Sequence, residues 1–137
     1  MKFTHVLLSI LGTLAVAAGQ SPSKAIVTNL ETAKWTVEKG GLESVLVRTD
    51  AATGGMELLV RFPSGHVVPA HSHDSNEHIV VLEGQLALHQ DTGDTIINTG
   101  GLAYLPAHEV QRMSCSSKSR CTFYLAWDGN PASHAAK

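Results

Sequence analysis

Short apolar runs separated by glycine-centred breaks recur along the chain from residue 43 to residue 128. The runs are rich in β-branched residues, and breaks such as Pro63-Ser64-Gly65 have the composition of tight turns. Many short strands at regular spacing indicate an all-β fold, either an antiparallel sandwich or a barrel. The expected strands are Ser44–Val47, Met56–Phe62, Ile79–Leu82, Leu86–Leu88, Thr95–Ile97, Leu102–Leu105, Val110–Met113 and Thr122–Ala126.

The segments on either side of this region are more polar and less regular. Residues 20–42 predict an N-terminal extension, residues 43–128 a single barrel domain, and residues 129–137 a C-terminal tail whose end is frayed. Within the extension, the pattern predicts two short strands, Ala25–Val27 and Trp35–Val37.

The first 19 residues have the pattern of a secretory signal peptide. Lys2 precedes an apolar stretch from Val6 to Ala18, and small residues place a cleavage site between Ala17 and Gln20. The stretch is shorter than the roughly 20 residues of a comfortable membrane span, although an uncleaved anchor is the alternative interpretation. We therefore expect a periplasmic or secreted protein with no membrane association after cleavage.

Charge and cysteine content narrow the classes of partner. The net charge of -2 and the 5% aromatic content give neither the basic surface nor the stacking platforms of a nucleic-acid-binding protein. Cys115 and Cys121 flank a five-residue polar segment, and in an exported protein such a pair predicts a disulfide. We expect this bond to join the ends of a tight antiparallel hairpin, with two free thiols as the alternative.

The segment between Gly65 and Gly84 carries the most specific chemistry. His71 and His73 lie two residues apart, so both imidazoles project from the same face of a strand. A turn at residues 74–76 can bring Glu77 alongside them. Two imidazole nitrogens and one carboxylate suit one divalent transition metal such as Mn, Fe, Zn, Ni or Cu, and leave coordination positions open.

This segment resembles the first motif of the cupin superfamily, G-x5-H-x-H-x3-E-x6-G, at every fixed position from Gly65 to Gly84. The resemblance covers about residues 40–128. It implies a single cupin-type jelly-roll β-barrel of antiparallel strands, one metal bound by His71, His73 and Glu77, a small-molecule ligand and a homodimer.

The second cupin motif, G-x5-P-x-G-x2-H, matches only in part. Gly100 and Pro106 are in place, but His108 occupies the glycine position and Gln111 occupies that of the usual metal histidine. Gln111 is therefore a candidate fourth ligand or a hydrogen-bonding neighbour, and it binds transition metals more weakly than imidazole does. Strand parity favours Gln111 over His108 as the residue nearer the metal, unless a bulge turns His108 inward.

Two functions remain open at this point. The resemblance implies a metal-dependent enzyme of the dioxygenase, isomerase or lyase type, with Glu109, Tyr104 and His108 as candidates for moving protons. The alternative is a non-catalytic module that binds a metal or a small ligand, and a barrel that has lost its metal is a third interpretation. The residues expected to line the barrel interior are Phe62, Leu86, Tyr104, Met113, Phe123 and Leu125.

Overall fold

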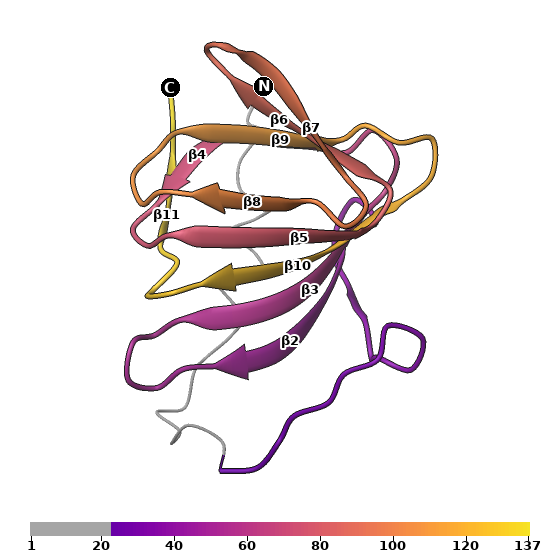
Figure 1. Cartoon of the computed structure of the whole chain (residues 1–137), viewed down its shortest axis with the longest axis vertical. Coiled ribbons are helices and arrows are strands. Elements are labelled where there is room, and N and C mark those ends of the chain that lie inside the picture. Colours follow the sequence, from indigo (N-terminus) through magenta and orange to yellow (C-terminus); the bar gives the residue numbers. More distant parts are fainter. Residues whose placement is uncertain (1–22) are drawn as a thin grey trace.

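The computed structural model of the chain describes residues 23–137, so the expected signal peptide over residues 1–19 lies outside the described residues. The described part consists of two facing antiparallel sheets (Figure 1). The first has six strands in the order β1-β2-β3-β10-β5-β8, and the second has five in the order β11-β4-β9-β6-β7. Their bounds are β1 Thr36–Val37, β2 Glu43–Thr49, β3 Met56–Phe62, β4 Val67–His73, β5 Glu77–Glu83, β6 Gln85–Gln90, β7 Gly93–Asn98, β8 Leu102–Leu105, β9 Gln111–Cys115, β10 Cys121–Trp127 and β11 Ser133–Ala135.

The two sheets enclose a single apolar core, which confirms the all-β jelly-roll prediction. Along β10, Phe123, Leu125 and Trp127 face inward at every second position, as expected for a strand with one face in the core. Phe123 is fully buried and meets Phe62 of β3 edge-to-face, with 4.9 Å between the ring centroids. The core therefore sits between the six-stranded sheet and the five-stranded sheet, and β10 runs through the middle of the former.

Three expectations about the periphery are wrong. Ala25–Val27 forms no strand, because Ile26 and Val27 are exposed and pair with no neighbour. The C-terminal tail is not frayed, since its residues Ser133–Ala135 form β11 and pair with β4. Tyr104 does not line the interior: it is 57% exposed and packs against the ring of His78 on the outer face.

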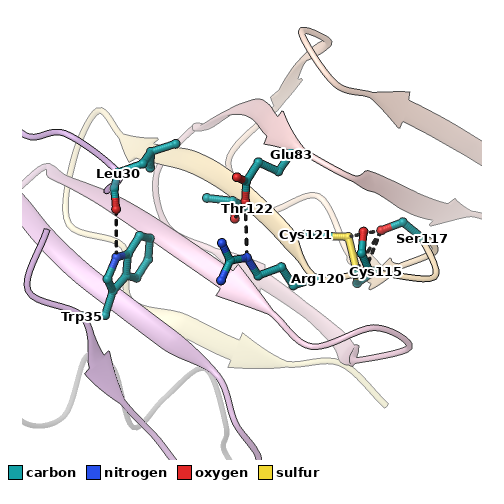
Figure 2. A network of polar contacts seen from close by, with 9 residues as sticks. Leu30, Trp35, Glu83, Cys115, Ser117, Arg120, Cys121 and Thr122 are labelled. Carbon is teal, nitrogen blue, oxygen red and sulfur yellow. Dashed lines mark hydrogen bonds and ion pairs between the residues drawn. A yellow bond between two sulfur atoms is a disulfide. The ribbon is translucent and has the colours of Figure 1, made fainter. Parts of the chain in front are cut away.

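The predicted disulfide between Cys115 and Cys121 is confirmed, but its place in the fold is not a hairpin (Figure 2). Cys115 ends β9, which pairs with β4 and β6, whereas Cys121 begins β10, which pairs with β3 and β5. The bond therefore links the two sheets at one end of the barrel. Gly84 lies against this corner with φ of 77°, and a Cβ there would come within 2.8 Å of the Arg120 carbonyl oxygen.

Replacing both Cys115 and Cys121 by alanine should lower the free energy of unfolding by about 2 kcal/mol, because the bond closes a short loop in the unfolded chain. Urea denaturation of the oxidised protein and of the variant measures the difference. Ser119→Ala, in the same exposed loop, is the control and should change stability by less than about 0.5 kcal/mol. Equal stability of the double variant and the oxidised protein would contradict this prediction.

No helix among residues 23–137 is both long and apolar enough to cross a membrane.

Candidate metal centre

Three side chains of the predicted metal site meet in the interior where β4 ends and β5 begins. His71 and His73 lie on β4 and Glu77 opens β5, and their exposed fractions are 6%, 2% and 2%. One candidate ligand atom from each residue lies within 4.8 Å of the others. The structure therefore brings together the three residues that the spacing predicted to meet.

A β-bulge in β4 gives the two histidines their inward direction. Val68 pairs with Met113 and His71 pairs with Gln111, so β4 uses three steps where β9 uses two. In a regular strand, residues three positions apart such as Val68 and His71 would face opposite sides of the sheet, yet both are buried because the bulge absorbs one position. Pro69 lies in the bulge, where its missing N–H costs no ladder hydrogen bond.

Backbone carbonyls orient both imidazole rings. The Nδ1 atom of His71 lies 2.8 Å from the Pro69 carbonyl oxygen, and Nδ1 of His73 lies 2.9 Å from the Pro131 carbonyl oxygen. A carbonyl only accepts, so each Nδ1 carries the proton and donates it, which leaves the Nε2 lone pair free. This second contact of the ring is the usual arrangement of metal-binding histidines.

Burial keeps the two rings neutral. It lowers the pKa of His71, and it lowers the pKa of His73 to about 4, although the Pro131 carbonyl partly offsets the latter effect. At neutral pH both Nε2 atoms are therefore unprotonated, which is the form that binds a metal.

Glu77 faces a ring that cannot donate to it. Its Oε2 lies 3.3 Å from Nε2 of His73, and this Nε2 is buried without a hydrogen-bond partner. Because His73 is neutral, the contact is not an ion pair, and when Glu77 is ionised two acceptor atoms face each other. Burial raises the pKa of Glu77 to about 7. The amide of Gln111 and the nearby indole of Trp127 act in the opposite direction, although the indole makes no hydrogen bond of good geometry. A divalent cation between the two atoms would satisfy both, so the residues present fit a metal ion.

Gln111 and His108 take the directions that strand parity favoured. The Gln111 side chain is 3% exposed, and its Nε2 donates to Oε2 of Glu77 at 2.7 Å, while its Oε1 is buried without a partner. The His108 side chain is 73% exposed, and its Nδ1 lies 3.7 Å from Asp74. The φ of His108 is 67°, and its N–H donates to the His73 carbonyl, so the loop caps β4 through its backbone.

The other two residues predicted to move protons do not meet the metal ligands. Tyr104 lies on the outer face of β8, as described above. Glu109 is partly buried in the loop before β9, where Gln90 Nε2 donates to its Oε1 at 3.4 Å. Their assignment to catalysis stays a prediction.

Two residues near the site were missed in the sequence. Trp127 packs its ring against His73 with 5.1 Å between centroids, and the alternation of buried residues along β10 was the available signal. Pro131 acts through its backbone carbonyl, for which no residue-type pattern exists.

Sequence comparison places the chain near one family of small barrels. The sequence model of the family described as the ChrR cupin-like domain matches residues 23–128. No curated protein matches this sequence.

Solved structures of cupins share the fold at low sequence identity. A putative acetylacetone dioxygenase from Methylibium petroleiphilum has a TM-score of 0.70 and 17% identity, over 86% of this chain and 85% of that chain. The polyketide cyclase RemF from Streptomyces resistomycificus has a TM-score of 0.68 and 16% identity, over 83% and 87% of the two chains.

A third similar structure contains a protein named ChrR, the name that also appears in the description of the matched family. The complex of Rhodobacter sphaeroides SigE with the anti-sigma ChrR has a TM-score of 0.61 and 22% identity, over 73% of this chain and 51% of that chain. The present chain thus spans about half the length of that relative. Together, these similarities support the fold alone.

Proposed function

The chain belongs to the family of ChrR cupin-like domains, and on that premise we propose that His71, His73 and Glu77 bind one divalent transition-metal ion. The observation that carries the proposal is the buried, unpartnered Nε2 of His73, 3.3 Å from the Glu77 carboxylate. A buried acceptor without a donor is costly, and a bound cation removes that cost.

We further propose Gln111 as a neutral fourth group at the metal. Its Nε2 holds the Glu77 carboxylate in place, while its Oε1 is buried and has no other partner. An amide oxygen is a harder and weaker ligand for late transition metals than imidazole, so this site should bind Zn²⁺ less tightly than a site with a third histidine.

Replacing Gln111 by histidine should therefore raise the affinity for Zn²⁺ by at least about tenfold, the scale on which changes around a metal alter its binding. Competition with a chromophoric chelator measures the dissociation constant. Arg112→His is the matched control, since it introduces the same residue one position along β9, where the side chain is exposed. An unchanged affinity in Gln111→His, or an equal gain in Arg112→His, would contradict the role of Gln111.

For the biochemical activity, we propose a metal-dependent enzyme that acts on a small organic molecule, of the dioxygenase, isomerase or lyase type. The bound metal would supply Lewis acidity to a substrate oxygen. A hollow of about 590 Å³ lies next to Gln111, and its walls also include the carboxylate-bearing Glu109, whereas the three proposed metal ligands do not line it. It supports the proposal only as space for a small molecule beside Gln111. Arg112 also lines the hollow and offers a cation for a substrate carboxylate, and we propose Glu109 as the group that exchanges a proton.

A non-catalytic binding module is the second candidate function. It is favoured by the outward directions of Tyr104 and His108, because of the three residues predicted to move protons only Glu109 then lines the hollow. Incubation of the metal-loaded protein with a panel of small carboxylic and β-dicarbonyl compounds, followed by NMR and oxygen consumption, separates the two. Turnover that Glu109→Gln abolishes supports the enzyme, whereas saturable binding without turnover supports the module.

We also propose that the protein is exported and that it forms a homodimer. The Cys115–Cys121 disulfide is compatible with an oxidising compartment, as expected for a periplasmic or secreted protein. For a homodimer, the exposed apolar side chains of the edge strand β8, Leu102 and Tyr104, are the contacts we would expect it to use.

A further inference from the structure

The C-terminal segment 131–136, termed the C-terminal strap below, runs along the strand that carries both metal-site histidines. Its strand β11 pairs with β4 in the register Ser133 opposite His73 and Ala135 opposite His71 (Figure 1). The strap thereby covers the outer edge of β4, which would otherwise be the edge of the five-stranded sheet.

The strap reaches His73 through one backbone atom. The Pro131 carbonyl oxygen lies 2.9 Å from Nδ1 of His73, and Pro131 is itself buried. His71 differs, because its Nδ1 donates to Pro69 of its own strand. The tautomer of one histidine is therefore fixed locally, and that of the other depends on a segment 58 residues away in the sequence.

Four further polar contacts hold the strap, and Asp128 ahead of it, against the turn between β4 and β5. Before the strap, Asp128 accepts from the backbone N–H of Asn76 at 3.1 Å and from its side-chain amide at 2.6 Å. In the middle, Ala132 O accepts from the N–H of Asp74 at 3.1 Å, and His134 Nε2 lies 2.8 Å from the Asp74 carboxylate.

At its end the strap is tied by Ala136, whose N–H donates to the Ala70 carbonyl oxygen at 3.0 Å. The contacts therefore span residues 70 to 76, the stretch that contains both histidines and leads into Glu77. The match to the family model ends at residue 128, so the strap lies outside it.

We propose that the C-terminal strap is a positioning element of the metal centre, which fixes the tautomer and ring orientation of His73 through the Pro131 carbonyl. The effect on metal affinity rests on the proposed metal-binding function. Without this acceptor, either ring nitrogen of His73 could carry the proton, and the fraction with a free Nε2 would fall. Loss of such an outer contact typically lowers metal affinity by about 10–100-fold.

Two variants of the full chain test the strap. The first ends after Asn130, and the second inserts two glycines between Asn130 and Pro131, which keeps every strap residue but displaces the carbonyl from His73. The matched control inserts the same two glycines between Ala136 and Lys137, past the last contact of the strap. Circular dichroism establishes that each barrel is folded, and the insertion variant decides the question if the truncated chain does not fold.

The readouts are the imidazole ¹⁵N chemical shifts of the metal-free protein and the dissociation constant for Zn²⁺. We expect a single Nδ1–H tautomer of His73 in the wild type and the control, and mixed tautomers with about 10–100-fold weaker Zn²⁺ binding in the folded strap variants. A single tautomer and unchanged affinity in those variants would overturn the proposal. A wild type that binds no Zn²⁺ would overturn the metal-binding function instead, and the tautomer of His73 would still decide the role of the strap.

Discussion

Replacing His71 and His73 together by alanine should abolish stoichiometric metal binding. A structural zinc site with four ligands supplies about 10–16 kcal/mol of binding free energy, or about 2.5–4 kcal/mol per ligand. Loss of two imidazoles should thus weaken binding by at least about a thousandfold. Zn²⁺ titration against a competing chelator, combined with circular dichroism to establish folding, measures the effect.

The control for this variant is the replacement of two other histidines, His78 and His108. Both are exposed, and their side chains lie outside the buried group. We expect the control to bind Zn²⁺ as the wild type does. Full metal content in the folded His71→Ala, His73→Ala protein would show that the ion is bound elsewhere.

The largest expected loss of stability comes from Phe123→Ala, which should lower the free energy of unfolding by about 3–5 kcal/mol. Phe123 is fully buried at the centre of β10, packs edge-to-face on Phe62, and fills the space between the two sheets. Removing the ring leaves a cavity that the flanking strands β3 and β5 cannot close without breaking their ladders.

Urea denaturation monitored by Trp fluorescence measures this loss. The control is Phe123→Leu, which keeps most of the volume and should cost less than about 1.5 kcal/mol. A loss below about 1 kcal/mol in Phe123→Ala would mean that the two sheets do not depend on this contact.

Much of the fold could be read from the sequence because strands and turns have local signals. The runs around Val60, Ile79 and Leu125 have the composition of strands, and glycines with positive φ, such as Gly65 and Gly84, mark the turns between them. Strand partners are not local. The predicted disulfide between Cys115 and Cys121 is correct. The prediction that both belong to one hairpin is wrong, because β9 and β10 follow each other in the sequence but lie in different sheets.

The sequence predicts those parts of the candidate site that depend on side-chain type and on strand parity. His71 and His73 share a face, Glu77 follows a turn, and the parity argument correctly placed Gln111 inside and His108 outside. The error on Tyr104 has a simple cause, since an aromatic residue on a short edge strand can face either side. The Pro131 carbonyl was beyond sequence reasoning, because a backbone acceptor has no residue-type signature and its segment had been expected to fray.

The central claim is that the buried group of His71, His73 and Glu77 holds one divalent transition metal. Elemental analysis of the natively purified protein, before and after dialysis against a chelator and reloading with single metals, tests it most directly. The account predicts close to one equivalent of a transition metal per chain after reloading. A folded wild-type protein that retains no metal under any of these conditions would contradict it.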